Sequence, residues 1–299
     1  MKKTTAWISL LLYLLTAGCQ KQGTNGSQGF DFSENQNAVY FWRTSFRLDS
    51  TEQAFLRQYH INKIYCRYFD VVMDSARGPM PNATILFSDS LPDSVEIVPT
   101  VYITEDCMHE PHQGLAEKLV RRIVQMNKTH HINNVREIQI DCDFTSRSRK
   151  TYYDFLSAVA NCSPFTLHFS LLSTTIRLHQ LPMQAPPADY GVLMLYNTGD
   201  PRKWTERNPI LNIHDVQPYV KHLPDYPLPL AAAYPVFSWL RIIHGVHVEH
   251  TVEASEILSV KKMVEQKRKN LSRAIITYHL DNENINRYKP ETYEEIYHH

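Results

Sequence analysis

Stretches typical of β-strands recur along the sequence from residue 38 onward, and most of them are separated by segments with helical periodicity. In the segment 114–128, for example, Leu115, Leu119, Ile123 and Met126 fall on one helical stripe. The other predicted helices are residues 50–60, 148–161, 213–223 and 253–270. The predicted strands are residues 38–43, 63–69, 95–103, 137–143, 165–173, 190–196, 228–239 and 273–280.

Eight strands that mostly alternate with helices predict a (β/α)8 TIM-like barrel, a fold of about 250 residues. An open doubly wound sheet is the alternative, but no GxGxxG or Walker-type loop supports its nucleotide-binding version. Residues 71–94 lack a helical stripe, so we expect an irregular connection between the second and third strands, with 84–87 as an extra strand. No linker divides residues 38–299, which we interpret as a single domain.

The N-terminal segment predicts export. Lys2 and Lys3 precede an apolar run, residues 6–15, that is too short to span a bilayer. Residues 15–19, LTAGC, resemble the lipobox of bacterial lipoproteins, in which the cysteine is lipidated and becomes the mature N-terminus. The resemblance implies a signal peptide over residues 1–18, lipidation of Cys19, and a place in the bacterial cell envelope, with the outer membrane favoured. An ordinary cleaved signal or a short anchor is the alternative.

Residues 19–37 are rich in Gly, Ser, Asn and Gln, a composition that buries too little apolar surface to order itself. We therefore interpret them as a flexible tether between a membrane and the barrel.

Charge and cysteine content exclude several functions. Lys plus Arg and Asp plus Glu both number 31, and this balance argues against a nucleic-acid partner, which requires a basic surface. Export permits disulfides among Cys66, Cys107, Cys142 and Cys162, but the strand-like surroundings of Cys66 and Cys142 favour buried free thiols. No Cys/His cluster has zinc-site spacing, so we predict neither a metal nor a cofactor. The oligomeric state stays open.

The fourth predicted strand carries an unusual polar face. In residues 137–143, EIQIDCD, apolar Ile138, Ile140 and Cys142 suit the helix layer of a barrel, which directs Gln139, Asp141 and Asp143 into the lumen. The two aspartates then lie at the C-terminal mouth, where barrel enzymes place their active sites. Paired carboxylates can raise the pKa of one partner and make it a proton donor. A solvated strand end is the alternative.

Two motifs resemble those of the chitinase-like barrels of glycoside hydrolase family eighteen. QIDCD is similar to that family's DxDxE motif, with Gln139 in place of the first Asp, Asp141 matching the second and Asp143 in place of the catalytic Glu. MLYN, residues 194–197, is similar to the family's M-x-Y-D/N stretch, which implies that Tyr196 and Asn197 position a substrate.

A second resemblance covers most of the mature chain. IQIDCDFTSRSRKTYYDFL (138–156), TIRLHQ (175–180) and YNTGDP (196–201) resemble an uncharacterised family of bacterial TIM-barrel lipoproteins. That resemblance implies a barrel and an envelope location, and it brings no established activity.

Other residues are candidates for the same mouth. Arg177 either binds a polar ligand group or pairs with Asp189, and Arg67, in mid-strand, requires a carboxylate partner, for which Asp141 is the natural choice. Aromatic rings at strand ends can stack on sugar faces or fill the core. These rings are Trp42, Tyr196, Tyr234, Trp239 and Tyr278.

The sequence therefore leaves two functional hypotheses. The first is an envelope-anchored hydrolase that cleaves a glycan, with Asp143 as general acid and Asp141 orienting it or stabilising charge. The alternative is a non-catalytic lipoprotein that binds a glycan at the same mouth. The Asp at the expected Glu position favours the alternative, and the retained carboxylate pair favours the enzyme.

Overall fold

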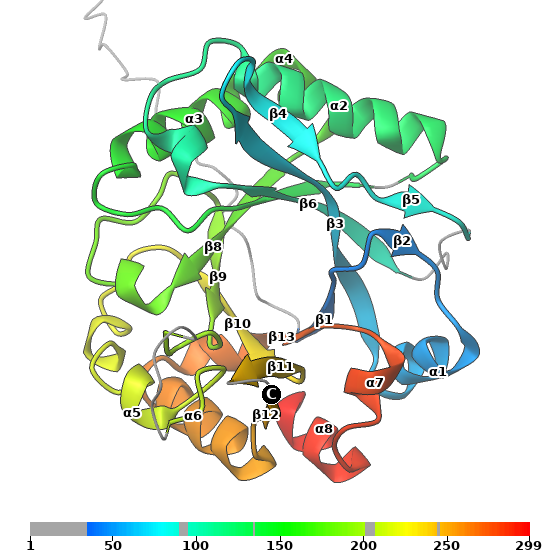
Figure 1. The fold of residues 1–299 in the computed structure, drawn as a ribbon, viewed down its shortest axis with the longest axis vertical. Coiled ribbons are helices and arrows are strands. Elements are labelled where there is room, and N and C mark those ends of the chain that lie inside the picture. The colour runs from blue at the N-terminus through cyan, green and yellow to red at the C-terminus, as the bar shows by residue number, and fades with distance from the viewer. Residues whose placement is uncertain (1–34, 90–94, 134, 201–206, 244–245) are drawn as a thin grey trace, which may run out of the picture.

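The computed structural model describes residues 35–89, 95–133, 135–200, 207–243 and 246–299, and eight parallel strands in these residues form a closed barrel (Figure 1). The barrel closes because its first strand pairs with both its second and its last. This confirms the predicted (β/α)8 TIM-like fold. The barrel strands are β1 (Gln36–Phe41), β3 (Ile61–Asp74), β6 (Glu96–Ile103), β7 (Glu137–Asp141), β8 (Leu171–Arg177), β9 (Tyr190–Met194), β10 (Leu230–Pro235) and β13 (Ala274–Tyr278).

Helices surround the barrel and cover it with their apolar stripes. In α2 (Leu115–Thr129), for example, the buried residues include Leu119, Ile123 and Met126, as the periodicity predicts. The helix predicted over 213–223 is instead two short pieces, α5 (Ile213–Val216) and the 3-10 turn η3 (Val220–His222). The other helices are α1 (Ser50–Gln58), α3 (Arg149–Asn161), α4 (Ser163–His168), α6 (Ala254–Lys267), α7 (Asn282–Ile285) and α8 (Pro290–Ile296), with 3-10 turns η1 (Glu105–Met108), η2 (Leu178–Gln180) and η4 (Lys269–Arg273).

The connection between the second and third barrel strands is irregular, as predicted. β3 continues into a hairpin with antiparallel β4 (Gly78–Asn82), through a turn in which Asp74 accepts hydrogen bonds from the backbone of Ala76 and Arg77. Gly78 has a φ of 77°, which a residue without a Cβ adopts at little cost. The extra strand expected at 84–87 corresponds to β5 (Leu86–Phe87), which pairs with β2 (Ser45–Phe46).

The strand predicted over residues 165–173 is wrong in its bounds. Residues Ser163–His168 form α4, with Pro164 in its first turn. Backbone amides of the first turn have no partner within the helix, so the missing N–H of proline costs nothing there. The strand β8 instead extends to Arg177. This shift carries Thr175 and Arg177 into the barrel wall.

A two-stranded hairpin lies beyond the C-terminal end of β10. It consists of β11 (Ser238–Ile243) and β12 (Val246–Thr251), which pair antiparallel. Arg287 Nη1 lies 3.0 Å from Glu249, and the Tyr288 hydroxyl donates to the Val252 carbonyl, so the base of the hairpin is held by the chain that follows α7.

The described cysteines are free. Cys66, Cys107 and Cys142 are buried and Cys162 is half-buried, which agrees with the expectation for Cys66 and Cys142. Cys19 lies outside the described residues. Within the described ranges, no helix is long and apolar enough to cross a membrane, and no three His, Cys, Asp or Glu side chains are grouped to hold a metal ion.

Candidate functional site

The carboxylates of the fourth barrel strand lie where alternation places them. β7 ends at Asp141, which is 2% exposed, and the Asp143 side chain, two residues further on, is 47% exposed. Cys142, between them, is fully buried. Asp141 thus lies inside the barrel near its mouth, whereas Asp143 reaches solvent.

Arg177 connects the two carboxylates. Its Nε donates to Asp143 Oδ1, and its Nη2 lies 3.6 Å from Asp141 Oδ1. Of the two roles left open for Arg177, a pairing with Asp189 is therefore wrong, since Asp189 accepts from the Leu172 backbone amide instead. Arg177 reaches the aspartates because it is the last residue of β8, which pairs with β7.

Burial makes Asp141 an unusual carboxyl group. Loss of hydration, opposed by the charge of Arg177 and reinforced by that of Asp143, raises the pKa of Asp141 to about 6. The Thr175 hydroxyl, on the same face of β8 as Arg177, donates to Asp141 Oδ1 at 2.6 Å. Burial alone would lower the pKa of Arg177, but the charges of Asp141 and Asp143 raise it above its ordinary value. Arg177 is therefore a permanent buried cation.

Arg67 does not pair with Asp141 as predicted. It forms a two-point ion pair with Asp70, three residues along β3, where the strand register shifts between Arg67 and Phe69. The irregular strand brings a carboxylate to Arg67 from its own chain segment, which alternation alone cannot predict. The guanidinium also lies over the Trp42 ring, 5.6 Å from its centroid.

Aromatic rings continue from the charged groups across the mouth. The Arg177 guanidinium carbon is 5.9 Å from the Tyr196 ring centroid, and Tyr196 stacks on Tyr278 at 4.7 Å. Tyr278 in turn contacts Trp42 at 5.7 Å. The structure thus brings together most of the predicted site residues: Asp141, Asp143, Arg177, Tyr196, Tyr278, Trp42 and Arg67.

A cavity of about 280 Å³ adjoins this cluster. Its lining includes Tyr278 together with Asn197 and Trp239. Asn197 has a φ of 54°, a left-handed conformation that asparagine tolerates better than most residues. Tyr234 is not part of the site, because it is fully buried and its charged neighbour is Glu265 of α6, on the helix side of β10.

Two polar atoms of the site lack a hydrogen-bond partner among the described residues. They are Arg177 Nη1 and the Tyr196 hydroxyl oxygen, and both are buried. An unsatisfied buried polar group costs about 1–3 kcal/mol, so a native structure that keeps two of them in one cluster of side chains requires an explanation.

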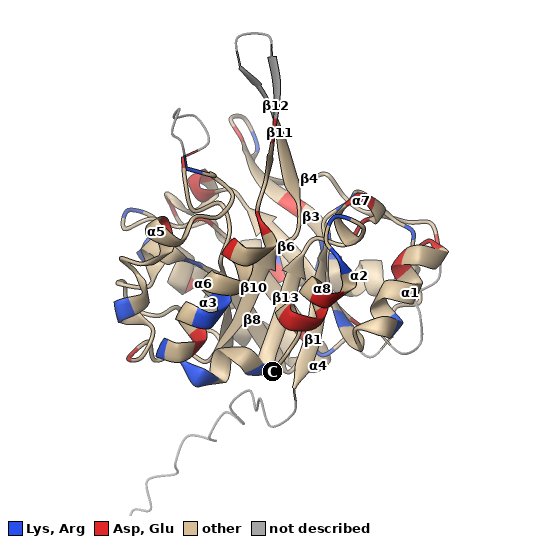
Figure 2. Ribbon diagram, turned by 90° about the horizontal axis from the view of Figure 1, so that it is seen from below, with Lys and Arg blue, Asp and Glu red and all other residues tan. Residues whose placement is uncertain are grey.

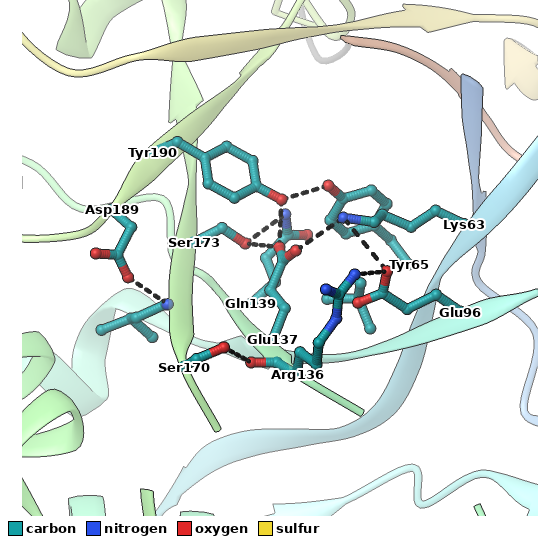
Figure 3. A network of polar contacts seen from close by, with 12 residues as sticks. Lys63, Tyr65, Glu96, Arg136, Glu137, Gln139, Ser170, Ser173, Asp189 and Tyr190 are labelled. Atoms are coloured by element: carbon teal, nitrogen blue, oxygen red, sulfur yellow. Dashed lines mark hydrogen bonds and ion pairs between the residues drawn. The ribbon is translucent and has the colours of Figure 1, made fainter. Parts of the chain in front are cut away.

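A second polar network lies deeper in the lumen (Figure 3), and of its two members on β7, Glu137 and Gln139, only Gln139 was predicted to face inward. Glu137 accepts hydrogen bonds from Lys63 Nζ at 3.2 Å, from Ser173 Oγ at 2.5 Å and from the Tyr190 hydroxyl. Gln139 accepts from the Tyr40 hydroxyl across the barrel at 2.8 Å. The alternation of the strand could have identified Glu137 as well, because Glu137 and Gln139 share a strand face with Asp141.

Comparisons with known proteins agree on the barrel. No family model matches the sequence, and no curated protein is similar to it. A chitinase from Bacteroides thetaiotaomicron superposes with a TM-score of 0.55 and 10% identity over 88% of this chain and 96% of that chain. The Bacillus cereus spore cortex-lytic enzyme SleL superposes with a TM-score of 0.54 and 13% identity over 88% of this chain and 73% of that chain. The chain therefore has the fold of chitinase-like glycoside hydrolase barrels.

Proposed function

We propose that the protein binds a glycan at the barrel mouth and holds it without cleaving it. The observation that carries this proposal is the pair of unsatisfied atoms, Arg177 Nη1 and the Tyr196 hydroxyl, beside two carboxylates and a row of aromatic rings. Sugar hydroxyls can donate to carboxylates and accept from a guanidinium or phenol, and sugar faces stack on aromatic rings. Two of the structural neighbours, a chitinase and a spore cortex-lytic enzyme, support a polysaccharide as the ligand class.

The ion pair between Arg177 and Asp143 favours binding over hydrolysis. A general acid must present its carboxyl oxygen to the leaving group, whereas Asp143 Oδ1 is held by a hydrogen bond from Arg177 Nε. Asp143 also stands where the resembling hydrolases have a Glu, and its side chain is one methylene shorter. A displacement of about 1 Å can lower a rate by about a hundredfold.

Hydrolysis is the second candidate, and one observation favours it. The pKa of Asp141 is raised to about 6, so this carboxyl group can hold a proton in weakly acidic solution. In that mechanism Asp141, rather than Asp143, would be the proton donor, and ionised Asp143 would stabilise positive charge on the sugar.

Binding and product release by residues 30–299, which include every described element, distinguish the two candidates. We expect calorimetric binding of at least one member of a panel of soluble polysaccharide fragments, with no new reducing ends. Asp143→Asn should weaken that binding, whereas Asp154→Asn, at an exposed position on α3, should leave it unchanged. Product release abolished by Asp141→Asn would establish hydrolysis instead. Failure of every glycan to bind would refute both candidates.

We also propose that Cys19 carries a lipid that anchors the protein to the bacterial outer membrane. The support is the sequence LTAGC and the tether composition that follows it. Metabolic labelling with a palmitate analogue should label the chain in cells, and Cys19→Ala should abolish the label. A labelled Cys19→Ala chain would contradict the anchor.

A further inference from the structure

The chain enters the barrel at the end opposite the mouth, which we call the floor. All eight parallel strands begin at this end, and the first of them begins at Gln36. The Asn37 side chain there lies 2.6 Å from the ring of His299. Figure 2 accordingly shows the C-terminus at the end of the molecule away from the β11–β12 hairpin. A tether from Cys19 therefore reaches the barrel at its floor.

Beside this entry point lies a surface rich in cations. Residues 260–273, from the second half of α6 through η4, contain six basic residues and one acidic residue, Glu265. A groove of about 710 Å³ separates this segment from the last residues of the chain. Three exposed lysines of the segment, Lys262, Lys267 and Lys269, form what we call the basic floor surface.

The nearby acidic groups do not cancel this charge. Glu265 pairs with Lys261 at 2.8 Å, and Lys261 also donates to the His298 carbonyl, so that pair is neutral. Arg268 donates hydrogen bonds to the backbone carbonyls of Tyr226 and Leu228, so we assign it a structural role and leave it out of the surface.

On α8, Glu295 lines the groove and is one negative charge against the three exposed lysines. Burial and the negative charges of Glu294 and Glu291 raise the pKa of Tyr59, the residue that follows α1. These two glutamates therefore lie on the side of α8 that faces α1. An excess of positive charge therefore remains on the basic floor surface.

We propose that the basic floor surface binds the anionic lipid head groups of the membrane to which the tether leads, so that the mouth faces away from that membrane. The sixteen steps from Cys19 to residue 35 can span at most about 55 Å. The surface is thus held near the lipids, where each lysine contributes attraction over about one Debye length. The inference rests on the proposed anchor for this proximity, but the surface can be tested without it.

Vesicle binding by the unanchored residues 30–299 is the test. We expect sedimentation with vesicles of phosphatidylcholine plus phosphatidylglycerol, weaker at high salt, and none with phosphatidylcholine alone. Lys262→Gln/Lys269→Gln should lower the apparent affinity by about thirtyfold, because each lysine near an anionic surface contributes about a factor of five. The matched control is Lys118→Gln/Lys150→Gln, which removes the same charge from exposed positions on α2 and α3.

Equal losses in the two double variants, or binding that is insensitive to salt and phosphatidylglycerol, would overturn the inference. A failure to bind the vesicles that contain phosphatidylglycerol would overturn it as well. Each of these results leaves the glycan proposal intact, because the substituted lysines lie on the outer helices and the mouth is assayed separately by calorimetry.

Discussion

The lower and upper halves of the barrel lumen are both polar, but they are satisfied to different degrees. In the lower half, Glu137 accepts three hydrogen bonds, and Lys63, Ser173 and Tyr190 supply them from three different strands. In the upper half, Arg177 and Tyr196 each keep a buried atom without a partner among the described residues. A saturated network holds a fold together, whereas an unsaturated one beside a mouth is suited to a polar ligand. Under the proposed function, the difference separates polar groups that hold the fold from polar groups that bind a ligand.

Removal of Lys63 should give the largest effect on stability. Lys63→Met leaves the fully buried Glu137 carboxylate without its cation, and breaking a buried ion pair in this way costs about 3–5 kcal/mol. Urea unfolding of residues 30–299 measures the loss, and the exposed Lys118→Met should change stability by less than about 0.5 kcal/mol. If Lys63→Met were as mild as its control, the lower network would not be structural.

The pH dependence of stability should come from the upper half. The folded pKa of Asp141, about 6, lies above the value near 4 of an unfolded aspartate, so folding favours the protonated form. The corresponding stability is complete below about pH 4 and is lost as the pH rises through about 6, a decrease on the order of 2–3 kcal/mol. Asp141→Asn should remove this slope in urea unfolding, and the exposed Asp154→Asn should keep it. A slope that persists in Asp141→Asn would assign the titration to another group.

Sequence reasoning predicted the barrel and the inward face of β7 because alternation is a local property. It failed where contacts between residues far apart in the sequence determine the bounds of a strand or the partner of a side chain. Alternation in residues 165–169 mimicked a strand, but Pro164 begins a helix there, and this shift hid the position of Thr175 beside Asp141. The partner of Arg67 was mistaken because a register shift in β3 brings Asp70 to it. Pairing between side chains on separate or irregular strands is set by register, which the sequence does not state.

Arg177 should affect ligand binding more than any other residue of the upper half. Arg177→Met removes the one charged donor among the described residues that contacts both Asp141 and Asp143, and hydrogen bonds to charged groups contribute about 1.5–3 kcal/mol. We expect about a 10- to 100-fold weaker affinity for the tightest glycan of the panel, measured by calorimetry. The exposed Arg121→Met on α2 is the control. Retained affinity in Arg177→Met would place the glycan elsewhere on the molecule.

Two tyrosines test the comparison with the smallest change, the loss of one oxygen atom. Tyr190→Phe removes a donor to Glu137 and should lower stability by about 1–2 kcal/mol without weakening glycan binding. Tyr196→Phe removes a hydroxyl that has no partner among the described residues, so stability should change by less than about 0.5 kcal/mol while affinity falls about three- to tenfold. Both tyrosines are buried and both belong to β9 or to the residues just after it, so burial does not explain a difference in their effects on stability. The Tyr190 hydroxyl donates a hydrogen bond and the Tyr196 hydroxyl has no partner among the described residues. If the two substitutions lowered stability equally, hydrogen bonding would not distinguish the two halves of the lumen.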